Sequence, residues 1–372
     1  MSPATPVQPP AGQASPSSQL PKDWAERGLS PLAARSGSAT RQVPEEPCPW
    51  RSHFQRDRDR IIHAKAFRRL AHKTQVFVAT SSDHFRTRLT HTLEVSQVAR
   101  TLARGFALNE DLTEAISLGH DLGHTPFGHA GEEVLDELNP FGFHHQDHSV
   151  RVVTRLAKNG AGLNLTREVI DGISKHSKGR GPIFAAGPFR PLTHEAQLVR
   201  VADIIAYLAH DLDDALESGL LGLDEIPPEL DSFFGHRASA RIGVMVEDLL
   251  TQSKVSDDDM EFRFSPKTHK SMVDLRSFLD LKVYRHPLLA SQLAFGQSCI
   301  KYIFVVLMEN KGLFETLPMR HLAETRVQAV CDFIAGMTDR YAFAYAQNLS
   351  RGLATAKFTP INPDDVPSFL EF

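Results

Sequence analysis

HDLGHTPFGHAGE, residues 120–132, places three histidines and two carboxylates in one short stretch. An Ala-, Ile- and Leu-rich run leads into His120, and glycine and proline residues break the chain soon afterwards. Adjacent His and Asp side chains at a helix end can reach the same cation, because imidazole offers a nitrogen and carboxylate an oxygen. The remaining polar side chains of the stretch, His124, His129 and Glu132, are then placed to move protons or to hold a phosphate. A helix end with only local hydrogen bonds is the alternative, and the density of ionisable groups argues against it.

Two further candidate ligands lie far from this stretch, each in an apolar helical segment. His91 lies in TRLTHTLEVSQVAR (87–100), and Asp203 lies in LVRVADIIAYLAHDLDD (198–214). A carboxylate within so apolar a segment must be paired, hydrogen-bonded or bound to metal. Either residue alone is more often a structural group, but with the first stretch they complete a set of donors for one divalent metal: His91, His120, Asp121 and Asp203. A mixed nitrogen and oxygen set suits Mn, Fe, Zn or Mg.

Three side chains near the candidate ligands suit a phosphorylated sugar. Arg88 lies three residues before His91 and shares its helix face, so its guanidinium can make a bidentate contact to a phosphate. Tyr207 and Asp211 follow Asp203 at i+4 and i+8, on one face of the helix. The ring can stack on a sugar, and the carboxylate can accept a hydrogen bond from the 3′ hydroxyl. A place for Tyr207 in the core remains equally open.

The composition favours a protein of a reducing compartment. The 372 residues carry a net charge of −4, without the basic signature of a nucleic-acid-binding protein, and 41% apolar residues are enough for a core. The three cysteines show no paired spacing, and no secretory signal is visible. The longest apolar run, residues 300–308, contains Lys301 and is too short to span a bilayer. We therefore expect a cytoplasmic protein that does not contact a membrane.

Helical periodicity dominates the chain and predicts an all-α, mostly helical fold with at most short strands. Residues 1–49, rich in proline, are expected to form a disordered or loosely ordered N-terminal tail. A strongly basic helix is predicted over residues 51–73, either as a solvated face or as a surface for phosphates. Further helices are predicted over residues 90–106, 110–118, 131–138, 148–158, 166–176, 194–217, 239–251, 267–279, 287–310 and 319–348. Residues 224–231 are expected to form a loop, and residues 75–79 and 261–264 are the best candidates for strands.

Five segments together resemble the deoxyguanosinetriphosphate triphosphohydrolase-like family of HD-domain proteins. They occur in family order: RDRDRIIHAKAFRRLAHKTQVF (56–77), TRLTHTLEV (87–95), HDLGHTPFGHAGE (120–132), ADIIAYLAHDLDD (202–214) and AGMTDRYA (335–342). The resemblance implies an HD-type catalytic core over residues 50–220. It also implies that a C-terminal helical region, residues 221–372, completes the site and makes oligomer contacts.

The family pattern implies a role for each candidate residue. The metal ligands that it implies are His91, His120, Asp121 and Asp203. Near the leaving group and the attacking water it places His124, His129 and Glu132, and it gives His145 as a further histidine that contacts phosphate. For the sugar and the α-phosphate it implies Gln75, Arg88, Tyr207 and Asp211.

Two departures from the pattern bear on substrate preference. Ile204 stands where the family usually has an acidic residue after the ligand Asp203. The segment HHQDHSVR (144–151) leaves His144 and His148 as alternatives to His145. Neither departure touches the four implied ligands.

The activity that the resemblance implies is hydrolysis of a deoxynucleoside triphosphate, dGTP or several dNTPs, to deoxynucleoside and inorganic triphosphate. A metal would polarise the α-phosphate, and His129 is the candidate acid for the 5′ oxygen, with Glu132 orienting His124. Family members form homo-oligomers, and some bind regulatory dNTPs or single-stranded DNA. Two alternatives stay open: an HD-type 5′-nucleotidase or phosphomonoesterase with the same metal centre, and a non-catalytic binder of nucleotides or nucleic acid.

Overall fold

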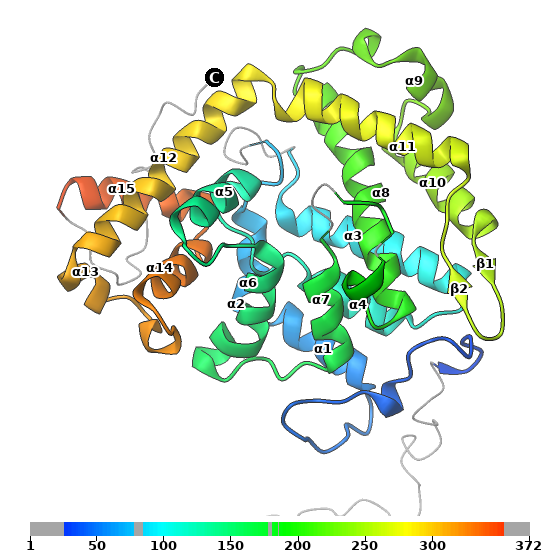
Figure 1. Ribbon diagram of the computed structural model, residues 1–372, viewed down its shortest axis with the longest axis horizontal. Coiled ribbons are helices and arrows are strands. Elements are labelled where there is room, and N and C mark those ends of the chain that lie inside the picture. Colours follow the sequence, from blue (N-terminus) through cyan, green and yellow to red (C-terminus); the bar gives the residue numbers. More distant parts are fainter. Residues whose placement is uncertain (1–25, 78–84, 178–180, 185, 353–372) are drawn as a thin grey trace, which may run out of the picture.

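The computed structural model describes residues 26–77, 85–177, 181–184 and 186–352 (Figure 1). Most of the described chain is helical, so the predicted all-α fold is confirmed. Two antiparallel strands of two residues each, β1 (Lys254–Val255) and β2 (Met260–Glu261), form the one sheet among the described residues. The helices are α1 (His53–Ile62), α2 (Lys65–Arg69), α3 (Arg88–Gly105), α4 (Glu110–Gly119), α5 (Gly128–Leu138), α6 (His145–Arg151), α7 (Arg167–Lys175), α8 (His194–Glu217), α9 (Pro228–Phe234), α10 (Ala238–Gln252), α11 (Pro266–Leu279), α12 (Pro287–Glu309), α13 (Lys311–Glu315), α14 (Arg326–Ala335) and α15 (Asp339–Ser350).

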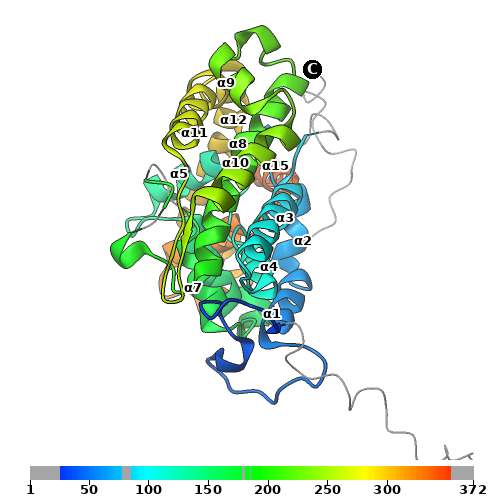
Figure 2. The same cartoon turned by 90° about the vertical axis from the view of Figure 1, so that its right-hand side faces the viewer.

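Helix α8 forms the centre of the larger of two hydrophobic clusters, packed along α3 and against α4 and α7 (Figures 1 and 2). Thr193 caps its first turn by accepting a hydrogen bond from the backbone N–H of Ala196. Its apolar residues are buried on every side, including Ile204 and Ile205. A helix that is apolar all round is stable only inside a core. Helix α8 is therefore a rigid support for any polar side chain that it carries.

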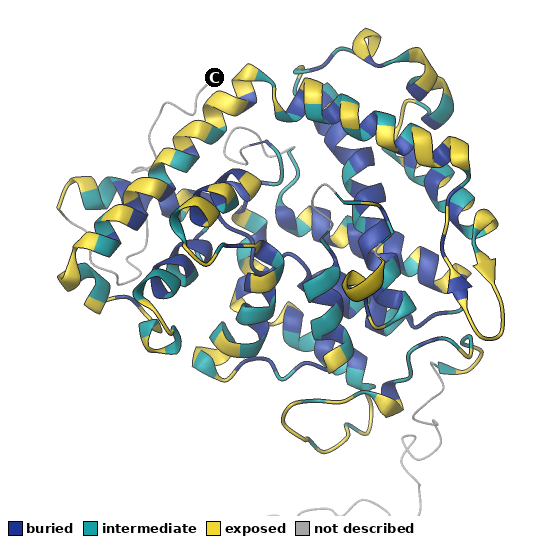
Figure 3. Ribbon diagram, viewed as in Figure 1, coloured by how far each residue is buried: buried dark blue, intermediate teal, exposed yellow. Residues whose placement is uncertain are grey.

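The smaller cluster joins the C-terminal helices to α5. Phe127 and Leu135 pack there against Ile300 and Leu307 of α12 and Ile334 of α14. Helix α12 runs along the upper left of the molecule in Figure 1 and contributes Leu289 to the larger cluster as well. It is the one helix among the described residues that is long and apolar enough to cross a membrane, a test that core helices also pass. Its outer face is exposed along much of its length (Figure 3).

Several predicted helices and loops differ from the structure. The helix expected over residues 51–73 breaks after α1, because Ala64 takes an extended conformation before α2. The helix expected over residues 319–348 is divided into α14 and α15, and Thr338 caps the second of these. The loop expected over residues 224–231 is wrong in part, since Pro228 opens α9 at a position where proline favours a helix start.

The predicted strands are mostly absent. In the segment 75–79, residues 75–77 form no strand, and residues 78–79 lie outside the described residues. Of residues 261–264, only Glu261 belongs to a strand. Both segments are too short for an alternating pattern to distinguish a strand from an extended loop.

Part of the predicted N-terminal tail lies against the helical core. Residues 1–25 are outside the described residues, whereas residues 26–49 follow the lower edge of the molecule (Figure 1). Arg41 forms an ion pair of 2.5 Å with the buried carboxylate of Asp57 in α1. The backbone N–H of Ala34 donates to Glu195 in α8 at 2.9 Å. The division of the chain at residues 50 and 220 stays a prediction.

Candidate metal centre and histidine cluster

The end of α4 carries the His-Asp pair. His120 caps this helix, and its Nδ1 lies 2.6 Å from the carbonyl oxygen of Ser117, which can only accept. The hydrogen is therefore on Nδ1, and the lone pair of Nε2 faces away from the helix. Gly123 makes the turn possible, because a Cβ there would lie 2.1 Å from the backbone nitrogen of Ser149. The broken helix end thus fixes the His120 ring in one tautomer and one orientation.

The four predicted ligands converge from three helices. His91 Nε2 of α3 lies 3.1 Å from Asp203 Oδ1 of α8. Asp121 offers Oδ1 at 3.4 Å from His120 Nε2 and Oδ2 at 4.0 Å from His91 Nε2. One ligand atom each of His91, His120 and Asp203 can be chosen so that all lie within 4.8 Å of one another. The four side chains thus lie close together, and their role as metal ligands stays a prediction.

This constellation fits a divalent cation. His120 Nε2 is buried and makes no hydrogen bond among the described residues. Two carboxylates in so buried a place need a compensating positive charge. Burial opposes ionisation of Asp203, but the hydrogen bond from His91 outweighs it and lowers the pKa of this carboxyl below its usual range. A set of two imidazoles and two carboxylates suits Mn, Fe or Zn better than Ca.

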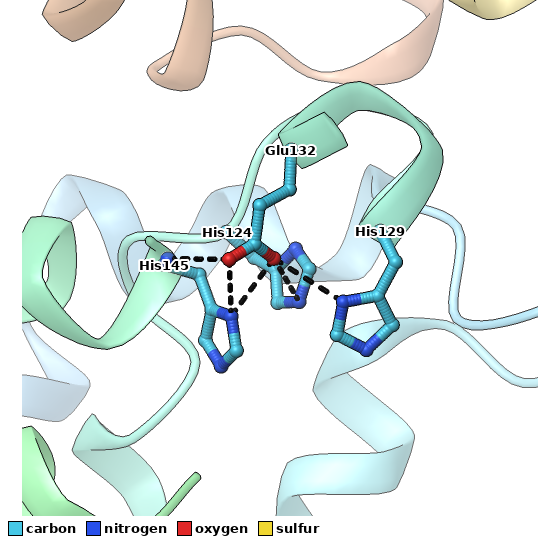
Figure 4. Close-up of side chains that lie close together, drawn as sticks. All are labelled: His124, His129, Glu132 and His145. Atoms are coloured by element: carbon cyan, nitrogen blue, oxygen red, sulfur yellow. Dashed lines mark hydrogen bonds and ion pairs between the residues drawn. The ribbon is translucent and has the colours of Figure 1, made fainter. Parts of the chain in front are cut away.

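A second group of side chains lies beside the candidate ligands: His124, His129, Glu132 and His145 (Figure 4). The carboxylate of Glu132 accepts hydrogen bonds from His145 Nδ1 at 2.9 Å and from His129 Nδ1 at 3.2 Å. His124 Nε2 is farther from it, at 3.9 Å, and the His124 ring stacks on His145 with centroids 4.3 Å apart. Glu132 therefore orients His145 and His129 more directly than His124.

The residues of this histidine cluster differ in pKa and in exposure to solvent. Burial raises the pKa of Glu132, but hydrogen bonds from His129 and His145 outweigh that effect and hold the pKa well below its usual range. Burial, with Arg88 nearby, lowers the pKa of His124 well below its ordinary value. The side chain of His129 is 73% exposed. The cluster thus combines a fixed carboxylate, a buried neutral imidazole and an imidazole open to solvent.

Helix α6 shows which histidine of the segment 144–151 belongs to the cluster. His145 begins α6 and points at Glu132, whereas His144 is exposed at the cap position. His148 faces elsewhere, with Nδ1 2.9 Å from the carbonyl oxygen of Gly123. Of the three histidines, His145 is the one that joins the cluster.

Comparisons with known proteins agree with this geometry. The HD domain model matches residues 88–208, and the phosphohydrolase-associated domain model matches residues 262–348. A deoxyguanosinetriphosphate triphosphohydrolase-like protein of Desulfatibacillum aliphaticivorans is 48% identical over 332 residues, covering 86% of this chain and 94% of that protein. The chain belongs to the deoxyguanosinetriphosphate triphosphohydrolase-like family. Proteins with the same name from Caldanaerobacter subterraneus subsp. tengcongensis and Ruegeria sp. are 48% and 41% identical and cover 84% and 85% of the chain, and 90% and 97% of their own lengths.

In this triphosphohydrolase-like chain, the predicted phosphate contact Arg88 lies at the candidate metal centre itself. Its guanidinium donates to Asp121 Oδ2 at 2.7 Å, and the side chain is almost completely buried. Gln75 lies on the neighbouring loop, where its Oε1 is buried without a hydrogen-bond partner among the described residues. An unsatisfied buried amide oxygen is costly unless a ligand or water donates to it. Both positions are compatible with a substrate contact.

A third residue that the sequence analysis did not single out, Tyr284, contacts the predicted sugar-binding pair. Asp211 is buried, and its Oδ2 accepts a hydrogen bond of 2.5 Å from the Tyr284 hydroxyl. Tyr284 ends a short helical segment after α11, and burial together with Asp211 raises its pKa well above the ordinary value. Tyr207 is half-buried on the same side of α8, and burial raises its pKa. No periodicity connects Tyr284 to α8, so its role required the fold.

Two histidines were also missed. His210 lies 2.8 Å from Glu94 and 3.2 Å from Asp211. Burial lowers its pKa, but the hydrogen bonds that His210 donates to these two carboxylates prevail and raise the pKa to about 9. His176 follows α7 and is buried against His120, where burial and the His120 and His145 rings lower its pKa to about 3. His210 is therefore a buried cation and His176 a buried neutral imidazole near neutral pH.

Two other aspartates of α8 form ion pairs within the chain. Asp214 is buried and forms an ion pair with Arg86, and Asp213 forms one with the buried Arg241. These pairs tie α8 to the loop before α3 and to α10. Runs of aspartate at the end of a helix look exposed in a sequence, and the tertiary partners were not predictable.

The predicted basic helix is partly neutralised within the chain. Arg56 and Arg60 pair with Glu45 at 2.6 and 2.5 Å, and Arg58 pairs with Glu114 at 3.2 Å. Arg56, Arg60 and other cations border a cavity of about 630 Å³, whose lining includes none of the four candidate ligands. Its basic lining residues are Arg51, Arg56, Arg60, Lys65, Arg68, Arg69 and Lys158. This cavity is thus a second place where the chain gathers positive charge.

Proposed function

We propose that this chain is a metal-dependent triphosphohydrolase that cleaves deoxynucleoside triphosphates, dGTP or several dNTPs, at the α-phosphorus. The observation that carries the proposal is the meeting of His91, His120, Asp121 and Asp203 beside a cluster of three imidazoles and one carboxylate. Burying so many polar groups at one point costs free energy, so core packing alone does not explain them. The names of the related proteins support the same class of substrate.

The four ligands would hold one divalent cation, Mn, Fe, Zn or Mg. When bound, such an ion supplies Lewis acidity toward a phosphate oxygen and acidifies water. Arg88 would then neutralise charge on the α-phosphate with its fixed guanidinium fork. Since Arg88 already contacts Asp121, a small rotation brings it to a phosphate held at the same place.

The histidine cluster would move the protons of the reaction. Water attacks the α-phosphorus, the bond from that phosphorus to the 5′ oxygen breaks, and the 5′ oxygen must gain a proton. His129 is exposed at the mouth of the cluster and is the candidate acid for this oxygen. Glu132 would hold His129 and His145 in place, and the neutral His124 would accept a hydrogen bond from water or phosphate.

The sugar would lie against α8. Tyr207 would stack on the deoxyribose, and Asp211 would accept a hydrogen bond from the 3′ hydroxyl while Tyr284 keeps the carboxylate oriented. Gln75 would contact the sugar from the opposite loop. Side chains packed against the 2′ carbon of the deoxyribose would leave no room for the 2′ hydroxyl of a ribonucleotide.

The experiment is hydrolysis in ¹⁸O-labelled water. The protein is incubated with each dNTP, singly and mixed, with Mn or Mg, and the products are separated and weighed by mass spectrometry. The proposal expects deoxynucleoside and triphosphate, with the ¹⁸O in the triphosphate. Orthophosphate as the released product would favour the HD-type nucleotidase or phosphomonoesterase, and no turnover under any mixture would favour a non-catalytic binder.

We further propose that the basic cavity beside α1 and α2 receives the triphosphate of a regulatory dNTP. Its cations outnumber the two carboxylates in its lining, Asp59 and Asp332, and apolar side chains such as Leu156 and Phe333 supply room for a base. Replacing Lys65 by Gln should weaken activation by a second dNTP in mixtures. Single-stranded DNA is the other partner that this charge could attract, and its binding should weaken steeply with salt.

A homo-oligomer is proposed on the basis of α12. Leu288, Phe295 and Tyr302 recur every seven residues along this helix and are 66%, 48% and 41% exposed. An apolar stripe of this spacing suits a second helix. Light scattering should give a mass above 41.3 kDa, and Phe295→Glu should lower it.

A further inference from the structure

The buried carboxylate of Asp211 has a partner at each of its two oxygens. Oδ2 accepts the hydrogen bond of 2.5 Å from the Tyr284 hydroxyl, and Oδ1 lies 3.2 Å from His210 Nε2. Asp211 and His210 are each 2% exposed. Because each carboxylate oxygen has two lone pairs, one partner on each oxygen fixes the orientation of the group and leaves it able to accept from a ligand.

The imidazole of His210 is itself held by a second carboxylate, on α3. Its Nδ1 lies 2.8 Å from Glu94 Oε2, so each ring nitrogen faces a carboxylate. Glu94 is anchored in turn, because its Oε1 accepts a hydrogen bond of 2.9 Å from Arg86 Nε, and Arg86 also pairs with Asp214 of α8. A chain of charged side chains thus runs from the loop before α3 through His210 to Asp211.

Core packing alone does not explain this chain of charged side chains. Helices α3 and α8 are already joined by apolar side chains of the larger hydrophobic cluster. Removing ionisable groups from water costs free energy, and apolar residues of the same volume often stabilise a core as well. What the charged chain adds is a fixed direction for its last member, the Asp211 carboxylate.

His210 lies beside the candidate metal centre without the place of a ligand. Its ring packs edge-on against His91, with centroids 5.0 Å apart. Among the described residues, the groups of side chains that could share an ion do not include His210. Its two polar contacts are with Glu94 and Asp211, so they act on the end of the site assigned to the sugar.

We propose that His210 is a positioning residue for recognition of the nucleotide sugar. With Glu94 fixing its other nitrogen, His210 holds Asp211 so that a carboxylate lone pair faces the 3′ hydroxyl of the substrate. His210 touches no substrate atom in this arrangement and acts only through Asp211. The inference rests on the proposed function, which makes Asp211 the acceptor of that hydroxyl.

The test compares a dNTP with the matching 2′,3′-dideoxynucleotide, which lacks the hydroxyl that Asp211 would accept. His210→Leu should reduce the preference for the dNTP, measured as the ratio of the two kcat/KM values, by about 2–10-fold, the worth of one hydrogen bond. Most of the loss should fall on the dNTP, because the dideoxynucleotide offers no hydroxyl for Asp211 to accept. General damage to the site would instead slow both nucleotides alike and would overturn the proposal.

A double-mutant cycle shows whether His210 acts through Asp211. The protein that carries both His210→Leu and Asp211→Asn should lose no more of the preference than Asp211→Asn loses alone. Additive losses would mean that the two residues act separately, and they would overturn the proposal.

Glu94→Gln keeps the test decisive if His210→Leu fails to fold. The amide preserves the size of a half-buried side chain but removes the charge that faces His210 Nδ1. The preference for the dNTP should fall in the same direction as in His210→Leu, and by less. The matched control is His236→Gln, which separates an imidazole from Asp231 at the surface, where the two lie 2.7 Å apart and the His236 side chain is 75% exposed. This control should keep the wild-type preference.

Metal content separates positioning of Asp211 from an effect on His91. Elemental analysis of His210→Leu should give as much bound metal as in the wild type. Loss of metal together with equal slowing on both nucleotides would overturn the proposal, since His210 would then act through the neighbouring His91.

The role of His210 and the proposed function fail in different ways. A wild type that hydrolyses dNTPs but treats both nucleotides alike would overturn the role of His210 and leave the activity standing. A wild type that hydrolyses neither nucleotide would contradict the proposed function, and the same variants would then be compared by the Kd of the two nucleotides. A binding preference for the 3′ hydroxyl that falls in His210→Leu would support the positioning role, and a preference that does not fall would overturn it.

Discussion

His91 Nε2 of α3 lies 3.1 Å from Asp203 Oδ1 of α8, although more than a hundred residues separate them in the chain. The two helices pack along each other in the larger hydrophobic cluster, so apolar contacts fix this polar pair. Most apolar side chains of helix α8 are buried, so the helix cannot rotate without disrupting the core. The core therefore holds the candidate ligands in place before any ion arrives.

Glu132→Gln tests the histidine cluster. The amide keeps the size of the side chain but loses the charge and the second acceptor that hold His129 and His145. We expect kcat to fall by about 10²–10⁴-fold with a much smaller change in KM, the range typical of acid–base groups.

The matched control is Glu133→Gln, since Glu133 is the exposed neighbour on the same helix. Steady-state kinetics of both variants are compared with the wild type. Equal activity of Glu132→Gln and Glu133→Gln would remove Glu132 from the reaction.

Asp211→Asn tests recognition of the 3′ hydroxyl. If Asp211 accepts this hydrogen bond, the wild type should prefer a dNTP over the matching 2′,3′-dideoxynucleotide by about 10–100-fold, the worth of a bond to a charged group. Asp211→Asn should lose most of that preference, because the carboxylate that distinguishes the two nucleotides is gone.

The measurement is kcat/KM for both nucleotides with both proteins. Tyr284→Phe should give an intermediate result, since it removes the hydroxyl that orients Asp211. A preference that is unchanged in Asp211→Asn would place the 3′ hydroxyl elsewhere.

Asp339→Ala tests how the C-terminal helices support the site. The fully buried Asp339 accepts hydrogen bonds from the backbone N–H of Thr74 at 2.8 Å and of Phe127 at 2.9 Å. Its loss leaves both donors unsatisfied, so we expect the free energy of unfolding to fall by about 2–4 kcal/mol. Activity should fall as well, because Phe127 leads directly into α5.

Chemical denaturation and activity assays measure the two effects. Arg340→Ala, at the exposed neighbouring position, should change neither. A stable and fully active Asp339→Ala protein would show that this buried carboxylate is dispensable.

Cys48 should be the reactive thiol of the protein near neutral pH. The hydrogen bond from the Arg51 guanidinium lowers the pKa of Cys48 to about 7, whereas burial raises the pKa of Cys299 to about 11 and of Cys331 to about 12. The thiolate is the nucleophile and its fraction grows as pH rises through the pKa.

We therefore expect the alkylation rate of Cys48 to reach half its maximum near pH 7, with the other two thiols unmodified there. Mass spectrometry after iodoacetamide treatment over a pH series measures this. Arg51→Gln should shift the midpoint upward, and a midpoint for the wild type near pH 9 would contradict the assigned contact.

The sequence predicts the helices and the four ligands because both leave local marks. Apolar periodicity marked α8 to its true ends, and the His-Asp pair is marked by the glycine and proline residues that end α4. Boundaries such as Pro228 of α9 were missed, since a proline pair can either break or start a helix.

The residues that the sequence did not reveal act through distant contacts. His176 lies in an ordinary helical segment, and only the packing of α7 on α6 and α4 brings it to His145 and His120. Tyr284 reaches Asp211 in the same way from a segment after α11. Such pairings depend on the tertiary arrangement and have no local pattern in the sequence.

The most direct measurement of the central claim is metal content and dNTP hydrolysis in Asp203→Asn. This variant removes one ligand charge at the point where α8 meets His91, and Glu217→Gln makes the same chemical change at an exposed position of α8. The account predicts that Glu217→Gln binds metal and hydrolyses dNTP as the wild type does. It predicts that Asp203→Asn folds but loses its tightly bound metal, and that its kcat/KM falls by at least about 100-fold. Loss of a ligand should cost at least as much activity as loss of a residue that only orients a ligand. Wild-type metal content and turnover in Asp203→Asn would contradict it.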